Sequence, residues 1–131
     1  MRDIVGTWRL VETAGHDPEG RPLAPPYGPV PMGIVTFTAE GRMMAVLCDG
    51  RTAMPEGEKR EYNSYCGNYS VEGDRLVTKV DAASDPSRFA IDQVRQVSFE
   101  GDRMVLRPPT DRVGDAVRQR VLTWEKIEPA Q

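Results

Sequence analysis

Short runs of alternating apolar and polar residues, separated by glycine-bearing turns, occupy most of this 131-residue chain. Alternation with a period of two is typical of β-strands that bury one face. A chain of this length fits one domain, which we expect to cover residues 1–131. We expect eight strands, at residues 4–13, 32–38, 42–48, 66–72, 75–81, 92–99, 103–108 and 117–127.

The turns between these runs favour hairpins. The tetrapeptide Glu-Gly-Asp-Arg occurs at residues 72–75 and again at 100–103, each time between alternating flanks. A Gly-Asp pair suits the two central positions of a tight hairpin turn, and Gly41 suits the turn after residue 38. Eight antiparallel strands in an open sheet would leave two exposed edges, whereas closure removes both. The sequence therefore predicts an all-β fold, a closed antiparallel barrel of about eight strands.

Three segments do not follow the alternation. Residues 15–31 contain six of the eleven prolines, so we expect a long ordered loop there rather than a central strand. Residues 55–65 begin with Pro55 and early acidic residues, which predicts one or two helical turns, the one short helical segment of the fold. Residues 82–91 are expected to form a crossover.

Charge and composition exclude several classes of protein. A net charge of −3 gives no basic footprint for nucleic acid, and no apolar run approaches the roughly 20 residues of a membrane span. Without a charged-then-apolar leader at Met1, we expect a cytoplasmic protein of bacterial type, with Cys48 and Cys66 as reduced thiols. The chain lacks the phosphate-loop, nucleophile-elbow, CxxC and HExxH motifs, and His16 is its single histidine. We therefore expect no cofactor and no metal.

An ordered set of motifs covers almost the whole chain. It comprises "VGTWRLVE", "YGPVPMGIVTFTAEGRMM", "YNSYCGNYSVEGDRLVTKV", "VRQVSFEGDRMVLRPP" and "LTWEKI". From Ile4 to Ile127 this set resembles the lipocalin-like domain family of small bacterial and fungal proteins. The resemblance implies a calycin-type barrel with a central cavity; some relatives isomerise or cyclise a bound intermediate of natural-product pathways. Members often carry a histidine in the strand after the equivalent of "EGD". This chain has "RLVTKV" there instead, with Lys79 and no histidine, so the resemblance does not support histidine-dependent chemistry or metal binding.

The resemblance implies a structural role for Trp8. Gly6, Trp8 and Leu10 share one strand face because side chains alternate. The resemblance implies that this face points inward, with Trp8 as a structural plug at the closed end of the barrel. An arginine of the last strand would then lie against the indole ring in a cation–π contact. Residues expected at this floor, besides Gly6 and Trp8, are Arg118, Arg120 and Trp124.

Arg95 is the main polar candidate for a binding site. It shares a strand face with Val97 and Phe99, and a buried guanidinium needs a partner because an unpaired buried charge is very costly. Two interpretations stay open: an internal ion pair with Glu12 or Asp81, or an anionic group on a ligand. A one-residue slip of the strand would instead turn Arg95 to solvent.

The other candidates are aromatic or apolar. Tyr65 and Tyr69 share a strand face, and each offers an apolar wall with a polar tip, although ordinary core packing is the commoner role. Tyr27 lies in the proline-rich loop, which could cover the barrel mouth as a lid or serve as a spacer. The residues expected to contact a ligand are Tyr27, Val35, Phe37, Met44, Tyr65, Tyr69, Arg95 and Val97.

Three functions remain open at this stage, and no catalytic residue is assigned. The first is binding of a small, mainly apolar molecule in the barrel. The second is an isomerase or cyclase acting on a hydrophobic intermediate. The third is a filled barrel that serves as an interaction or oligomerisation module, for example a homodimer. A cavity of about 300 Å³ or more would favour the first two.

Overall fold

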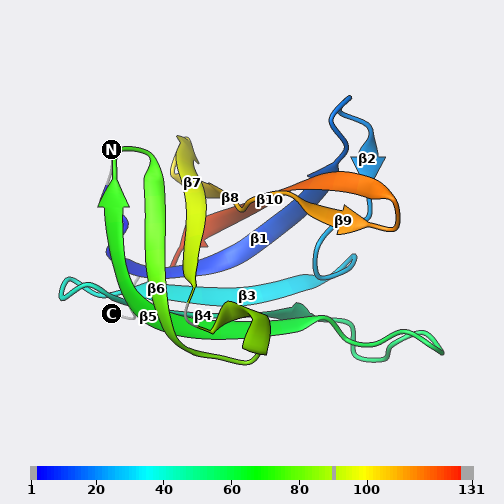
Figure 1. Ribbon diagram of the computed structural model, residues 1–131, viewed down its shortest axis with the longest axis horizontal. Helices are drawn as coiled ribbons and strands as arrows, with labels where there is room; N and C mark the ends of the chain where they lie inside the picture. Colours follow the sequence, from blue (N-terminus) through cyan, green and yellow to red (C-terminus); the bar gives the residue numbers. More distant parts are fainter. Residues whose placement is uncertain (1–2, 90, 128–131) are drawn as a thin grey trace.

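The computed structural model describes residues 3–89 and 91–127, so the ends of the expected domain and Ala90 of the expected crossover lie outside the described residues. Within these residues eight antiparallel strands form a closed barrel, as the sequence predicts (Figure 1). Each strand pairs with the next, and β1 pairs with β10 to close the ring. The barrel strands are β1 (Gly6–His16), β3 (Pro31–Phe37), β4 (Arg42–Asp49), β5 (Tyr62–Glu72), β6 (Arg75–Ala83), β7 (Asp92–Glu100), β8 (Arg103–Arg107) and β10 (Ala116–Lys126).

Both Glu-Gly-Asp-Arg segments form the expected hairpins. Glu72 pairs with Arg75 across the β5–β6 turn, and Glu100 pairs with Arg103 across the β7–β8 turn. Gly73 and Gly101 have φ angles of 64° and 61°, which side chains with a Cβ rarely adopt. Because only two residues separate the strands, these turns set the register of both hairpins.

The β4–β5 connection corrects one prediction. Residues 55–61 form a turn and extended chain rather than helical turns, and β5 begins at Tyr62 instead of residue 66. The physical reason lies at Gly57, whose φ of 83° cannot continue a right-handed helix. The backbone N–H of Asp49 donates to the Glu61 carbonyl at 2.9 Å, which extends the strand pairing outward instead.

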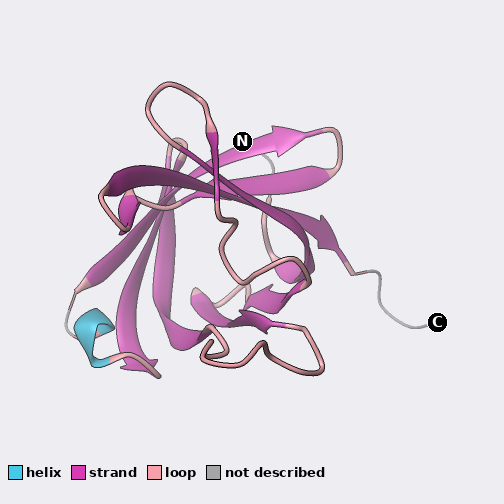
Figure 2. Cartoon of the chain, turned by 90° about the vertical axis from the view of Figure 1, so that its right-hand side faces the viewer, coloured by secondary structure: helices cyan, strands magenta, loops and turns pink. Residues whose placement is uncertain are grey.

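Among the described residues, a helical turn occurs in the segment that the sequence predicts to be a crossover, residues 82–91. It is η1 (Pro86–Arg88), a single 3₁₀ turn in which the Ser87 N–H donates to the Asp85 carboxylate at 3.0 Å. Figure 2 views the barrel from the end where the short strands β2 (Pro22–Leu23) and β9 (Asp111–Val113) lie, and shows η1 beside the barrel strands.

The proline-rich loop is ordered by contacts with β1 and β10. Thr13 Oγ1 donates to the Pro26 carbonyl at 2.7 Å, and Arg118 Nη1 donates to the Ala24 carbonyl at 2.6 Å. Within the loop, β2 adds a short edge to the outer end of β1. The loop therefore lies at the end of the barrel where β9 also extends the sheet (Figure 1).

Trp8 lies toward the other end of β1, and its partner differs from the one expected. Its ring is buried, its Nε1 donates to the Ile4 carbonyl at 2.9 Å, and Lys126 Nζ lies 5.8 Å from the ring centroid. The expectation of Arg118 or Arg120 against Trp8 is therefore wrong. Trp8 pairs with Lys126 across the sheet, so Arg118 is eight strand residues away, roughly 26 Å at the usual rise.

The inner and outer faces of β3 and β4 are both apolar. Inward residues include Val35, Phe37, Met43, Ala45 and Leu47, all at most 5% exposed. Outward residues include Met32, Ile34, Met44 and Val46, which are 41–60% exposed. In residues 3–89 and 91–127 no helix has the length and apolar character needed to cross a membrane.

Cys48 and Cys66 are free and lie on the outer face of neighbouring strands. Cys48 pairs with Tyr62, whereas Cys66 pairs with Met44, four residues along β4. That offset is roughly 13 Å along the strand, which is too far for a disulfide without movement of the backbone.

Gly67 provides a test of the barrel geometry. A β-bulge separates Cys66 from Gly67, and a Cβ at Gly67 would lie 2.0 Å from the Lys79 carbonyl oxygen. We expect Gly67→Ala to lower the free energy of unfolding by about 1–3 kcal/mol, because the β5 and β6 backbones must separate. Urea unfolding followed by circular dichroism measures this, with exposed Ser70→Ala on the same strand as the control. Equal stability of the two variants would contradict the close approach.

Candidate functional site

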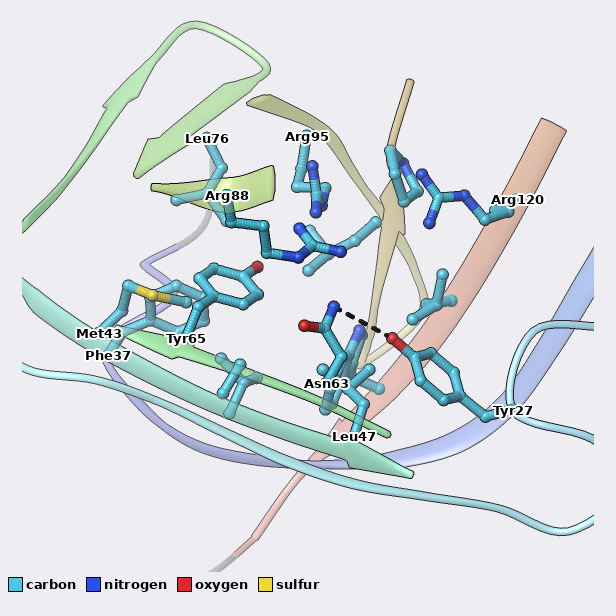
Figure 3. Close-up of a pocket in the computed structure, with 16 residues that line it drawn as sticks. Tyr27, Phe37, Met43, Leu47, Asn63, Tyr65, Leu76, Arg88, Arg95 and Arg120 are labelled. Carbon is cyan, nitrogen blue, oxygen red and sulfur yellow. Dashed lines mark hydrogen bonds between the residues drawn. The ribbon is translucent and has the colours of Figure 1, made fainter. Parts of the chain in front are cut away.

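A cavity lies inside the barrel, between the β3–β4 wall and the strands opposite. Its free volume is about 40 Å³, which is room for a few water molecules. Pockets that bind drug-sized ligands are far larger, with volumes of about 300 Å³ or more. Its lining combines an apolar wall with several polar groups that converge on one space (Figure 3). The lining residues are Tyr27, Val35, Phe37, Met43, Ala45, Leu47, Asn63, Tyr65, Leu76, Arg88, Arg95, Leu106, Pro108, Arg120, Leu122 and Trp124.

The apolar wall comes from the inward residues of β3 and β4. Val35 and Phe37 line the cavity, as the sequence predicts for their face. Met44 does not, and its expected place in the pocket is wrong because alternation on β4 points Met43 inward and leaves Met44 60% exposed. The methionine of this wall is therefore Met43.

Two further residues expected at the site pack beside the cavity instead of lining it. The Tyr69 ring meets the Phe37 ring edge to face at 5.1 Å between centroids, and its hydroxyl donates to the Thr38 carbonyl at 2.7 Å. Val97 is 5% exposed and belongs to the apolar core. Both residues support the wall of the barrel.

Tyr27 reaches the cavity from the proline-rich loop. It is 6% exposed and has a φ of 64°, held by a hydrogen bond from its backbone N–H to Glu61 Oε1 at 2.7 Å. Its hydroxyl accepts from Asn63 Nδ2 at 3.5 Å, and burial raises the pKa of this hydroxyl above its ordinary value. Tyr27 is thus a fixed, protonated part of the lining, and Asn63 Oδ1 has no donor among the described residues.

Arg95 faces the cavity and is 8% exposed. Its Nη1 donates to the Val94 carbonyl at 2.9 Å and its Nη2 to Gln93 Oε1 at 3.0 Å. Neither expected carboxylate partner is correct: Glu12 is exposed on β1, and Asp81 pairs with Arg42. Within the described residues, neutral oxygens are the hydrogen-bond acceptors that Arg95 finds.

Arg88 extends from η1 into the same cavity, which the sequence did not indicate. Its Nη1 donates to Gln93 Oε1, the same oxygen that accepts from Arg95. Its guanidinium lies over the Tyr65 ring, 5.3 Å from the centroid. Arg88 Nε is buried without an acceptor among the described residues. The sequence offered only one signal, the Ser-Asp-Pro segment that begins the turn.

Arg120 is the third guanidinium at the cavity, and it differs from Arg118 two residues before it. Arg118 forms two hydrogen bonds with the Asp111 carboxylate, at 2.9 and 2.7 Å. Arg120 Nη2 donates to the Pro109 carbonyl at 3.0 Å, and its Nε lies 3.4 Å from Asp111 Oδ2 without hydrogen-bond geometry. Burial lowers the pKa of Arg120, and the like charge of Arg95 acts in the same direction, while Asp111 opposes both.

The remaining expected floor residues are also placed by β10 and β1. Trp124 is 2% exposed and lines the cavity, and its Nε1 has no acceptor among the described residues. Gly6 pairs with Phe37 at the start of β1. The indole N–H of Trp124 and the Oδ1 atom of Asn63 are therefore two polar groups at the cavity that have no hydrogen-bond partner among the described residues.

Metal-ligating side chains do not gather in the part of the chain that the structure describes. No group of three or more His, Cys, Asp or Glu residues there is placed to hold a metal ion. The charged groups that converge on the cavity are arginines, whose planar forks suit carboxylate and phosphate groups.

Removing an arginine inside the cavity and removing one outside it should change the free energy of unfolding in opposite directions. We expect Arg95→Met to raise the free energy of unfolding by about 1 kcal/mol, because it removes a buried charge that has only neutral partners. Arg118→Met should lower it by about 2 kcal/mol, because it leaves partly exposed Asp111 without its main partner. Urea unfolding at pH 7 measures both variants. A loss of stability in Arg95→Met as large as that in Arg118→Met would show that Arg95 is adequately compensated.

Comparison with known proteins gives a family but no individual relative. The family model described as "Lipocalin-like domain" matches residues 5–127, which is nearly the whole chain. The comparisons with curated proteins and with solved structures gave no match. The match agrees with the closed eight-stranded barrel formed by the described residues. The chain therefore belongs to the lipocalin-like domain family.

Proposed function

We propose that this protein binds a small, mainly apolar molecule inside the barrel. The observation that carries the proposal is the composition of the cavity lining, an apolar wall with a few convergent polar groups. Binding sites for small molecules have this composition, and lipocalin-like barrels in general suggest binding of small molecules. The cytoplasmic location expected from the sequence stays a prediction.

The free volume of about 40 Å³ does not reach the roughly 300 Å³ that a preformed binding cavity would have, so the proposal requires side chains to move when a ligand enters. Arg88 is the best placed to do so, because it belongs to the short turn η1 and not to a barrel strand. Turning it outward breaks one hydrogen bond to Gln93 and the contact with the Tyr65 ring. Both are modest interactions, so the space beneath η1 is the proposed entrance.

The isomerase or cyclase hypothesis would depend on tyrosine and arginine side chains of the cavity lining, among them Tyr27. Because burial raises the pKa of its hydroxyl, Tyr27 stays protonated near neutral pH. It could donate a hydrogen bond to a bound carbonyl, but it would not serve as a general base. Binding requires no more than this, so we propose binding as the function.

The two tryptophans allow binding in the cavity to be measured directly. Trp124 lines the cavity, whereas Trp8 is buried toward the other end of β1. The variant Trp8→Phe keeps Trp124 as its single tryptophan. We expect octan-1-ol or octanoate to change the tryptophan fluorescence of this variant in a saturable way. The matched variant Trp124→Phe, which keeps Trp8, should change much less. Absence of a saturable change with either probe would contradict the proposed function.

A second candidate function rests on the outer face of β3, β4 and β5. Met32, Ile34, Met44, Val46 and Tyr62 are all 41–60% exposed, and the strand register places them side by side. A contiguous exposed apolar surface of this kind is typical of an interaction site. A second copy of this chain could cover it, because two-fold symmetry apposes the same apolar patch on both subunits. The homodimer is therefore kept as an alternative role for the barrel.

Size-exclusion chromatography with light scattering tests the homodimer. If β3 and β4 form the interface, Met44→Lys should convert a dimer to a monomer without loss of folding, since residue 44 is exposed. The control is Gln96→Lys, which makes the same kind of change at an exposed position on β7, outside this face. A wild-type chain that is monomeric at high micromolar concentration would exclude this role.

A further inference from the structure

Three guanidinium groups converge on the cavity from different elements: Arg88 from η1, Arg95 from β7 and Arg120 from β10. Figure 3 shows them facing a common space above Asn63. Gln93 Oε1 accepts hydrogen bonds from both Arg88 and Arg95, so one neutral oxygen serves two cations. Like charges in such a position repel one another, and nothing in this hydrogen-bonded group carries a negative charge.

The carboxylates near the cavity are already engaged. Asp111 is held by two hydrogen bonds from Arg118 and meets Arg120 only at 3.4 Å, without hydrogen-bond geometry. Glu61 accepts from the backbone N–H of Tyr27. Among the described residues, Arg120 is therefore the cavity arginine that lies near a carboxylate, and that carboxylate, Asp111, is already paired with Arg118.

Arg51 and Arg118, which do not line the cavity, each pair with a carboxylate. Arg51 donates to the buried Asp49 carboxylate through Nε at 3.0 Å and through Nη2 at 2.5 Å, and Arg118 donates to Asp111 through the same two atoms. The fold thus supplies a carboxylate to these guanidinium groups outside the cavity. Within the cavity it supplies neutral oxygens, and Arg88 Nε and Arg120 Nε are left without an acceptor among the described residues.

A filled barrel does not explain this arrangement. Apolar residues at positions 95 and 120 would complete the core at lower cost, because replacing buried charges by apolar side chains is often stabilising. A ligand that brings a negative charge does explain it, since it would supply acceptors for the free Nε–H groups and neutralise the repulsion. The planar guanidinium fork matches a carboxylate with two parallel hydrogen bonds, and a free volume of about 40 Å³ suits such a three-atom head group.

We propose that the ligand of this barrel carries a carboxylate, bound between Arg88, Arg95 and Arg120, with its apolar part against the β3–β4 wall. This inference rests on the proposed function and names the chemical class of the ligand, an amphipathic monocarboxylate. Arg88 then has two roles in one side chain. It moves to admit the apolar part, and it returns to donate to the carboxylate at the mouth.

A matched series of eight-carbon probes tests the inference. Octanoate, octan-1-ol and octylamine share an apolar chain and differ in head group, and Trp124 emission in Trp8→Phe reports binding of each. We expect octanoate to bind at least about 10-fold more tightly than octan-1-ol, because hydrogen bonds to charged groups are the stronger class. Octylamine should bind most weakly. Equal affinity for octanoate and octan-1-ol would overturn the carboxylate while leaving the proposed function intact.

Variants assign the effect to Arg88 and Arg95. Arg88→Gln and Arg95→Gln should each weaken octanoate binding by about 10-fold and leave octan-1-ol binding nearly unchanged. Arg112→Gln makes the same change of charge at an exposed position on β9 and should alter neither. Arg88 lies outside the barrel strands, so its variant remains informative if Arg95→Gln does not fold. An equal loss of octanoate binding in Arg112→Gln would overturn the inference, and failure of all three probes to bind would overturn the proposed function with it.

Discussion

Pairing of β1 with β10 is the constraint on which the rest of the structure depends. It joins the two ends of the chain's sheet, with Trp8 opposite Lys126 and His16 opposite Gln119. Closure removes both long edges, so the barrel needs no covering layer. It also gives every strand one inner and one outer face, and thereby decides which residues share the central space. The cavity and its charges follow from this closure.

Closure explains why unlike residues meet at the cavity. Arg95 and Arg120 lie on different barrel strands, β7 and β10, and Arg88 lies on η1 shortly before β7, yet all three side chains line the same cavity. Their charges are held near an apolar wall, where repulsion is weakly screened. A barrel selected only for stability would not retain this arrangement. We therefore interpret the arginines as a cost that binding of the proposed ligand would offset.

Much of the fold could be predicted from the sequence, because strand alternation and turn residues act locally. The eight strands and the turns at Gly73 and Gly101 needed no knowledge of the tertiary structure. The helical prediction for residues 55–65 was wrong because Pro55 and the acidic residues suit a helix, whereas Gly57 and the Asp49–Glu61 pairing exclude it. Met44 was misplaced because both faces of β4 are apolar, so composition could not decide between Met43 and Met44.

The sequence by itself determined a closed all-β barrel of the lipocalin-like family, since this depends on a period of two and on short turns. It left open whether the strand face that carries Arg95 points inward, and the structure decided that Arg95 lines the cavity. Only the tertiary structure decided the partners. It placed Lys126 instead of Arg118 against Trp8, and it brought Arg88 to Gln93. The physical reason is that partners across a closed sheet are set by register and bulges, which accumulate over many residues and leave no local signal.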